Sequence, residues 1–135
     1  MPELEVGASH SMRVTVDEGN SISFLGEDLR VYATPAMVHD VEYCCRDWLA
    51  EIGGDEKDSV GARVDIAHLA PTTLGSWVEI TVTVAEIAGP LITFDVDVRD
   101  PLEQVGKGMH QRFFAPIAKL DARLKAKAAA LAESA

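Results

Sequence analysis

Apolar and polar residues alternate with a period of two in three consecutive segments of the chain. The apolar positions are Val60, Ala62, Val64 and Ile66, then Val78, Ile80, Val82 and Val84, then Ile92, Phe94, Val96 and Val98. The turn-forming sequences "APTTLG" and "AGP" separate the segments. A period of two predicts half-buried strands, and short connections between them predict antiparallel pairing. The sheet therefore has one apolar face that another element must cover.

Two further segments complete the predicted sheet. Residues 12–16 alternate in the same way and predict a strand near the start of the chain. Residues 109–117 predict a last strand with less regular alternation, after the turn sequence "RDPLEQVGKG". The segment "DEGNSISFLGEDLR", residues 17–30, mixes turn residues with a short apolar patch and is interpreted as a covering loop.

A long amphipathic helix is predicted from Thr34-Pro35 to the "GGD" sequence at 53–55. Threonine is a favoured N-cap, and proline is tolerated at the first helical position. One stripe of this helix is apolar and contains Met37, Val38, Val41, Cys44, Cys45, Trp48 and Leu49. The two adjacent cysteines point in different directions on a helix, so we interpret them as small apolar residues and not as a disulfide. This helix is the element that can cover the sheet.

A second helix is predicted over residues 118–132, which are rich in alanine. Lys119, Arg123 and Lys127 are four residues apart and form a row that we interpret as a solvated face. The predicted fold class is α+β: a long central helix wrapped by an antiparallel sheet, with a C-terminal helix.

Composition narrows the class of protein. A chain of 135 residues, 47% hydrophobic and 25% charged, predicts a single folded domain over residues 1–135. The sequence has no apolar run near the roughly 20 residues that a membrane helix needs, and its N-terminus is unlike a signal peptide. We therefore expect a cytoplasmic protein without membrane association. A net charge of −10 argues against nucleic acid as a partner.

Three polar residues are candidates for chemistry. Glu42 falls at the border of the helical stripe, where it can form an ordinary i,i+4 pair with Arg46 or be held near the core. Thr34 can serve as an N-cap or as a functional hydroxyl. His68 continues the face that begins at Val60 and is expected to point inward, most often as a satisfied core histidine. If the helix packs on that face, the hydroxyl, carboxylate and imidazole converge in a way that suits acyl transfer.

The sequence resembles the hotdog-fold thioesterases, in particular the branch typified by fluoroacetyl-CoA thioesterase. The matching segments are "VYATPAMV", with Glu42 eight residues after Thr34, "SVGARVDIAHLAPTTLG" around His68, and "GKGMHQRFF" with His110 and Arg112. They occur in the family's order and span most of the chain.

The resemblance implies a homodimer with active sites at the subunit interface and an acyl-CoA substrate. It implies that Thr34, Glu42 and His68 are the catalytic set, that the backbone of Gly61 contacts the substrate, and that Arg112 lies near the site. No metal or separate cofactor is expected, since coenzyme A is part of the substrate. Whether Glu42 acts as nucleophile or general base stays open.

One segment departs from the family pattern. Leu25 and Asp28 stand where the fluoroacetyl-specific member has aromatic lid residues, so we expect a different small acyl group. The alternative function is a non-catalytic hotdog module that binds an acyl or acyl-CoA ligand. A hydratase on the same fold is disfavoured, because the adjacent His39 and Asp40 fall on the polar face of the helix.

Overall fold

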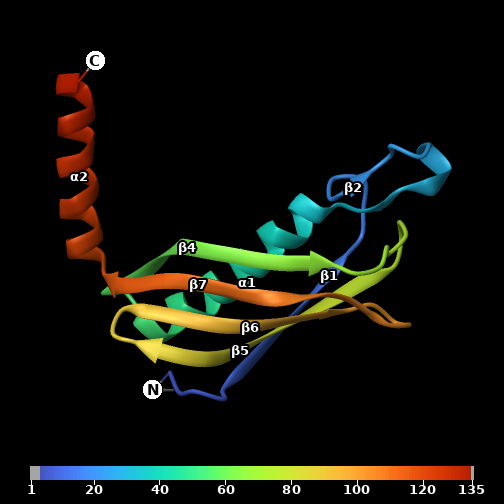
Figure 1. Ribbon diagram of the computed structural model, residues 1–135, viewed down its shortest axis with the longest axis horizontal. Coiled ribbons are helices and arrows are strands. Elements are labelled where there is room, and N and C mark those ends of the chain that lie inside the picture. Colours follow the sequence, from blue (N-terminus) through green and yellow to red (C-terminus); the bar gives the residue numbers. More distant parts are fainter. Residues whose placement is uncertain (1–3, 135) are drawn as a thin grey trace.

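A five-stranded antiparallel sheet curves around one long helix in the computed structural model, which describes residues 4–134 (Figure 1). The strands of this sheet are β1 (Ser9–Thr15), β4 (Lys57–His68), β5 (Trp77–Ala88), β6 (Leu91–Arg99) and β7 (Gln104–Pro116), in the spatial order β1-β5-β6-β7-β4. The short strands β2 (Ser21–Ile22) and β3 (Val31–Tyr32) pair with each other and flank the 3-10 helix η1 (Glu27–Leu29). The α-helices are α1 (Thr34–Gly53) and α2 (Ile117–Ser134). The predicted α+β arrangement is confirmed.

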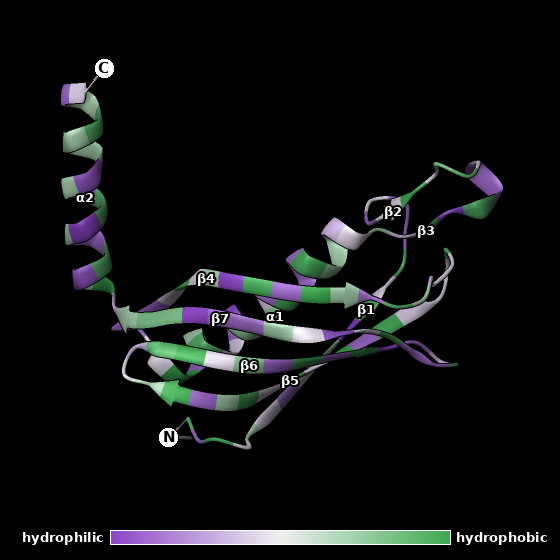
Figure 2. Ribbon diagram, in the orientation of Figure 1, coloured by the Kyte–Doolittle hydropathy of each residue, from purple (hydrophilic) through white to green (hydrophobic). Residues whose placement is uncertain are grey.

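The core lies between α1 and the inner face of the sheet. All eight apolar positions predicted on β5 and β6 are buried, and Met37, Val41, Cys44, Cys45 and Leu49 are buried on α1. Figure 2 shows hydrophobic and hydrophilic residues following one another along the strands. Burying a Val or Leu side chain contributes about 1.5–3 kcal/mol, so this layer holds α1 against the sheet. Both cysteines are free thiols, and burial raises the pKa of Cys44 to about 12.

A β-bulge at Ala62 changes the direction of side chains along β4, because this residue has no direct partner on β7. Val64 pairs with His110 of β7, whereas Val60 pairs with a residue three positions further along β7. Strand positions an odd number apart face opposite sides, so Val60 lies on the outer face, where it is 46% exposed. The prediction of one continuous inward face from Val60 to His68 is therefore wrong at Val60.

The first turn of α1 also differs from the prediction. Ala33 is the N-cap residue, no side chain caps the helix, and Thr34 is the first helical residue. The N-cap interpretation of Thr34 is wrong, because its hydroxyl bonds to another element. The predicted end of the helix is confirmed: Gly54, at φ 59°, donates its N–H to the carbonyl of Ala50.

Strand β7 begins five residues before its predicted start, so the "GKG" sequence lies in the sheet and not in a turn. Close packing explains its glycines. A Cβ atom at Gly106 would lie 2.6 Å from the sulfur of Met37, and one at Gly108 would lie 1.9 Å from the carbonyl oxygen of Asp65. From the sequence, these glycines were interpreted as turn formers. In the structure they lie where another segment of the same chain comes too close for a side chain.

The C-terminal helix α2 follows directly on β7 and projects away from the sheet (Figure 1). It has no buried residue among those described, and the row of Lys119, Arg123 and Lys127 is exposed as expected. Within residues 4–134, neither helix combines the length and hydropathy needed to cross a membrane.

Candidate active site

Thr34 and His68 meet where the start of α1 packs against the end of β4. The hydroxyl oxygen Oγ1 of Thr34 is 2.7 Å from Nδ1 of His68. The imidazole ring also packs edge-on against Tyr32, with 6.3 Å between ring centroids. The hydroxyl of Tyr32 donates in turn to Oδ2 of Asp40 at 2.5 Å, so this ring is fixed on both sides. Neither Tyr32 nor Asp40 was expected at the site from the sequence.

Burial sets the protonation of His68. It lowers the pKa of the imidazole, so the ring is neutral at pH 7. Its Nε2 atom is buried and has no hydrogen-bond partner within residues 4–134. The pair of Thr34 and His68 lines a cavity of about 290 Å³. A neutral imidazole bonded to a hydroxyl can take up or deliver a proton at that hydroxyl.

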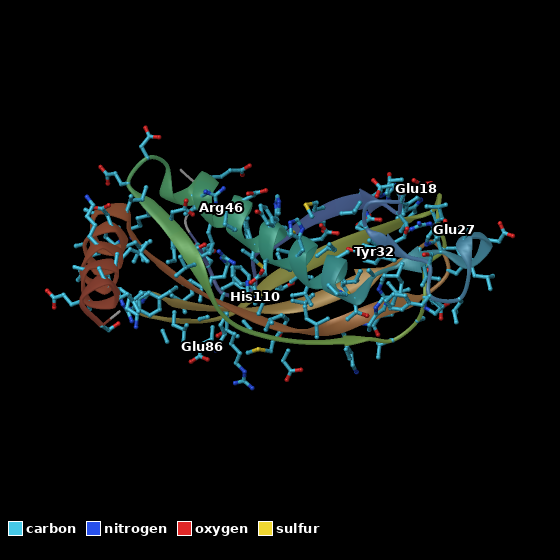
Figure 3. The ribbon with its side chains drawn as sticks, turned by 90° about the horizontal axis from the view of Figure 1, so that it is seen from above. Glu18, Glu27, Tyr32, Arg46, Glu86 and His110 are labelled. Atoms are coloured by element: carbon cyan, nitrogen blue, oxygen red, sulfur yellow. The ribbon has the colours of Figure 1, made fainter. Side chains whose placement is uncertain are left out.

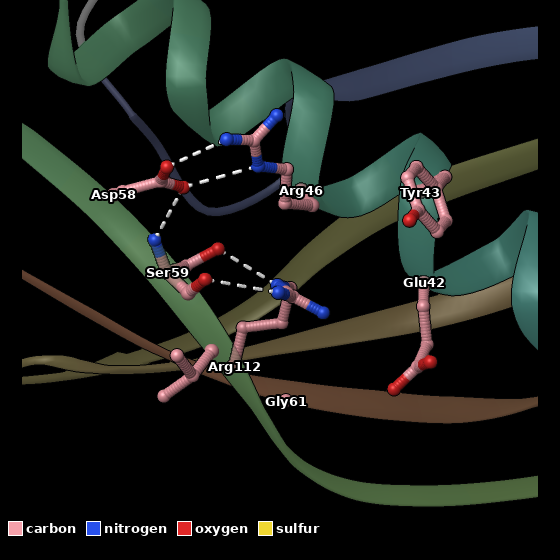
Figure 4. A pocket seen from close by; sticks show the side chains of 8 residues that line it. Glu42, Tyr43, Arg46, Asp58, Ser59, Gly61 and Arg112 are labelled. Atoms are coloured by element: carbon pink, nitrogen blue, oxygen red, sulfur yellow. Dashed lines mark hydrogen bonds and ion pairs between the residues drawn. The ribbon is translucent and has the colours of Figure 1, made fainter. Parts of the chain in front are cut away.

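Glu42 lies in the middle of α1 and extends toward β4, beside Gly61 (Figure 4). A Cβ atom added at Gly61 would lie 2.8 Å from Oε1 of Glu42, so only glycine leaves room for the carboxylate in this position. Arg46 forms its ion pairs with Asp58, at 2.6 Å, and with Asp47. The i,i+4 interpretation of Glu42 with Arg46 is therefore wrong. Within residues 4–134, Glu42 has no ion pair or side-chain hydrogen bond.

Arg112 is buried beneath this carboxylate and is held by two other residues. Its Nε donates to the hydroxyl of Ser59 at 2.7 Å, and its Nη2 donates to the carbonyl of the same residue at 3.1 Å. Its Nη1 donates to Nε2 of His110 at 3.2 Å. Burial lowers the pKa of Arg112, and the nearby charge of Glu42 opposes that shift. The guanidinium thus gives the region around Glu42 a fixed positive charge.

His110 connects this network to the β-bulge. Because a guanidinium can only donate, Nε2 of His110 must accept, and its Nδ1 donates to the carbonyl of Arg63 at 2.8 Å. The ring is fully buried, and burial lowers its pKa, which keeps it neutral. From the sequence, His110 was identified only as part of a motif. Its position two residues before Arg112, on the same face of a strand, was the signal that connects the two.

The structure divides the three predicted catalytic residues between two cavities. Thr34 and Glu42 are eight residues apart on α1, which is about 12 Å along the helix axis. Glu42, Gly61 and Arg112 line a cavity of about 550 Å³ that is separate from the one beside His68. In Figure 3 Tyr32 lies toward one end of α1 and Arg46 toward the other, with His110 between them. A single protomer therefore pairs Thr34 with His68, and separately places Glu42 against Gly61.

Comparison with known proteins identifies the family. The model of the fluoroacetyl-CoA-specific thioesterase family, FlK, matches residues 16–118. The chain belongs to the FlK family of thioesterases. The fluoroacetyl-CoA thioesterase of Streptantibioticus cattleyicolor is 27% identical over 97 residues, which are 72% of this chain and 70% of that protein.

Solved structures agree with the FlK family fold. The fluoroacetyl-CoA thioesterase FlK superposes with a TM-score of 0.80 at 23% identity, over 93% of this chain and 98% of that chain. A thioesterase superfamily member from Thermus thermophilus gives 0.81 at 25% identity, over 96% and 99%. A hot-dog-like protein from Thermanaerovibrio acidaminovorans gives 0.80 at 25% identity, over 90% and 91%. The hotdog fold is confirmed, and the protein is a thioesterase, a hydrolase by class.

Proposed function

We propose that this FlK family member hydrolyses a small acyl-CoA thioester to the free acid and CoA. Thr34, Glu42 and His68 are its catalytic residues, and the site is completed between the two subunits of a homodimer. The observation that supports this most directly is the 2.7 Å contact between the Thr34 hydroxyl and the neutral, half-buried His68. Such a pair, at a helix N-terminus in a thioesterase, suits proton transfer during attack on a carbonyl.

Each residue has a defined part in the reaction. Glu42 acts as nucleophile toward the acyl carbon or as general base toward the attacking water. His68 helps to move the proton that this water releases to the departing CoA thiolate, and such proton transfer contributes roughly 10²–10⁴-fold. Thr34 orients the substrate or the carboxylate. The backbone N–H of Gly61 is the proposed donor to the oxyanion, and the fixed charge of Arg112 lies beside it.

The CoA phosphates need basic groups in a chain of net charge −10. Arg99 is bound to Asp97 and Arg112 is held inside the protein, so neither is free for this purpose. Arg63 and Lys107 form no ion pair within residues 4–134 and are the better candidates on this chain.

Strand β4 supports the dimer. It pairs with β7 along one edge, while its other edge, twelve residues long, has no partner strand in the described protomer. An unpaired edge of that length favours addition of another strand, here a second copy in antiparallel orientation. In an antiparallel pairing centred on the middle of β4, the first half of one strand lies beside the second half of the other. Because Gly61 is in the first half, the partner's Gly61 then lies beside the half of β4 that ends at His68. We therefore propose that Glu42 acts together with the partner's Thr34 and His68.

The lid segment bears on the choice of acyl group. Phe24 is 86% exposed, and Leu25 beside it is also exposed, so neither forms an aromatic wall over the Thr34–His68 cavity in the protomer. With Leu25 and Asp28 in place of aromatic residues, we propose that the substrate is a small acyl group other than fluoroacetyl.

Thiol release from a panel of short acyl-CoA thioesters, including fluoroacetyl-CoA, tests the activity. We expect Glu42→Gln and His68→Ala to lower kcat by about 10²-fold or more, because each removes a proton-transfer group. Glu51→Gln, an exposed position of the same helix, is the matched control and should keep full activity. A wild-type protein that binds acyl-CoA but releases no thiol would identify a non-catalytic binding module instead.

Mixing two inactive variants tests whether the site lies between subunits. If each site combines Glu42 of one chain with His68 of the other, a heterodimer of the Glu42→Gln and His68→Ala variants contains one site in which both residues are intact. After subunit exchange at equal amounts, we expect about a quarter of wild-type activity, from one intact site in half of the dimers. If both groups act within one chain, mixing restores nothing, and the shared site is excluded.

A further inference from the structure

Helix α2 exposes a continuous apolar stripe. Ile117, Leu124 and Leu131 are spaced seven residues apart and lie on one side, together with Leu120. Leu124 is 65% exposed, and none of the helix's described residues is buried. In proteins, most of the stability of a helix comes from packing its apolar face against other elements. This stripe therefore lacks its packing partner in the protomer.

Positive charge runs beside the apolar stripe. Lys119, Arg123 and Lys127 form a row that adjoins it on the helical wheel. Lys125 forms an ion pair with Asp121, whereas the three residues of the row have none within residues 4–134. The helix carries a net charge of +2 in a chain of net charge −10. Its surface is thus suited to an acidic, partly apolar partner.

The position of α2 relates it to the open edge of the sheet. It begins immediately after Pro116, which pairs with Lys57, the first residue of β4. Figure 1 shows α2 rising past β4, on the side where the sheet has no further strand. A second copy that pairs with β4 is added on that same side.

Antiparallel pairing determines which part of the second copy meets α2. The start of one β4 lies beside the end of the partner's β4, and after His68 that end continues into the loop 69–76. This loop is joined to the turn 100–103 by a hydrogen bond from Thr72 to Asp100 at 2.8 Å. We call the two segments the end loops.

The end loops carry groups that match α2. Leu69, Leu74 and Leu102 are exposed there, and Leu102 is 90% exposed. Asp100 and Glu103 lie in the same turn region and supply negative charge. Leucines beside carboxylates on the end loops thus complement leucines beside cations on α2.

We propose that α2 of each protomer packs its apolar stripe and basic row onto the partner's end loops. The contact rests on the proposed dimer and adds a second region to the β4 pairing. Leu69 also lines the Thr34–His68 cavity, so α2 covers one end of that cavity in the partner subunit. The C-terminal helix is in this way part of the dimer and borders the partner's site.

Two α2 variants of equal charge test the contact. Leu124→Asp places a charge in the stripe, and Ala129→Asp places the same charge on another side of the exposed helix. By sedimentation equilibrium of the full-length protein, we expect Leu124→Asp to raise the dimer dissociation constant at least about tenfold, because the charge must be desolvated at the contact. Ala129→Asp should match the wild type. Equal constants for both variants, or a monomeric wild type, would refute the contact.

Crosslinking between two differently sized forms of the protein identifies the partner surface. One form carries Arg123→Cys and the other carries Glu103→Cys, while the native Cys44 and Cys45 are buried and do not compete. After subunit exchange, a short bismaleimide should join the two forms, and it should not join Ala129→Cys to Glu103→Cys. Self-crosslinking of Arg123→Cys alone would show α2 paired with α2 and overturn the proposal.

Thiol release by the same samples separates this proposal from the proposed function. A protein that dimerises and crosslinks as expected but hydrolyses no thioester retains the α2 contact and loses the enzymatic proposal. An active dimer whose dissociation constant is unchanged by Leu124→Asp retains the enzymatic proposal and loses the α2 contact.

Discussion

At the scale of single residues, Gly61 decides where the Glu42 carboxylate can lie. The two residues come from different elements, and the space of one missing Cβ atom lets Oε1 of Glu42 approach the backbone of β4. Arg112 lies just beyond, fixed by Ser59 and His110. The position of the Glu42 carboxylate therefore depends on the missing side chain at Gly61 and on the buried charge of Arg112.

Gly61→Ala should reduce activity with little loss of stability. The new methyl group would meet the far end of a flexible side chain, so Glu42 turns aside while the backbone stays in place. Since a displacement of about 1 Å can cost 10²-fold, we expect thiol release to fall by that order. Thermal unfolding should shift only slightly. In a Glu42→Gln background the same substitution should have almost no further effect, and a full additional loss there would contradict this role of Gly61.

At the scale of elements, β7 carries the buried polar residues beside Glu42 and sets the register of β4. It pairs with β6 along one edge and with β4 along the other, and it carries both His110 and Arg112. The carbonyl of Arg63, next to the bulge of β4, accepts a hydrogen bond from His110. Pairing of β7 with β4 thus sets the register that brings Gly61 beneath Glu42.

Gly108→Ala should disrupt this pairing. A Cβ atom there would lie 1.9 Å from the carbonyl oxygen of Asp65, and the backbone conformation, at φ 157°, also disfavours a side chain. Because the obstructing atom belongs to the backbone, we expect a loss of about 3 kcal/mol or more in the free energy of unfolding. Denaturant titration measures it. Gly19→Ala, whose nearest contact is the side chain of Asp17, is the control and should cost far less.

At the scale of the whole molecule, two histidines that stay neutral couple folding to pH. Burial lowers the pKa values of both His68 and His110 in the folded state below the ordinary value of 6.5. The unfolded chain therefore binds more protons than the folded chain in the pH range from about 6.5 down to the folded pKa values. The two neutral rings therefore make their full contribution to the free energy of unfolding above pH 6.5, and this contribution is lost as the pH falls through this range.

Stability should accordingly decrease from pH 7 to pH 5, beyond any change from the carboxylates. Thermal unfolding of the wild type and of His110→Asn at both pH values measures the effect. Asparagine can keep one donor and one acceptor but does not titrate, so the variant should lose less stability on acidification. The exposed His39→Asn is the control and should follow the wild type. A His110→Asn protein as sensitive to acid as the wild type would exclude this source.

The long helices, most of the long strands and the family could be predicted from local sequence patterns. Period-two alternation predicted β5 and β6 correctly, and the apolar stripe and the terminal glycines defined α1, because these patterns reflect burial relative to a residue's own element. The ordered motifs around Thr34, His68 and Arg112 indicated the thioesterase family that the comparisons confirm.

Contacts between residues of different elements could not be predicted in this way. The sequence does not reveal the bulge at Ala62, and with it the reversal of Val60, because the bulge depends on how β4 pairs with β7. Contacts between elements likewise directed the Thr34 hydroxyl to His68 and Arg46 to Asp58, in place of the local N-cap and i,i+4 pair. Local patterns fix the direction of a side chain on its own element, whereas its partners depend on the register and packing of elements far apart in the sequence.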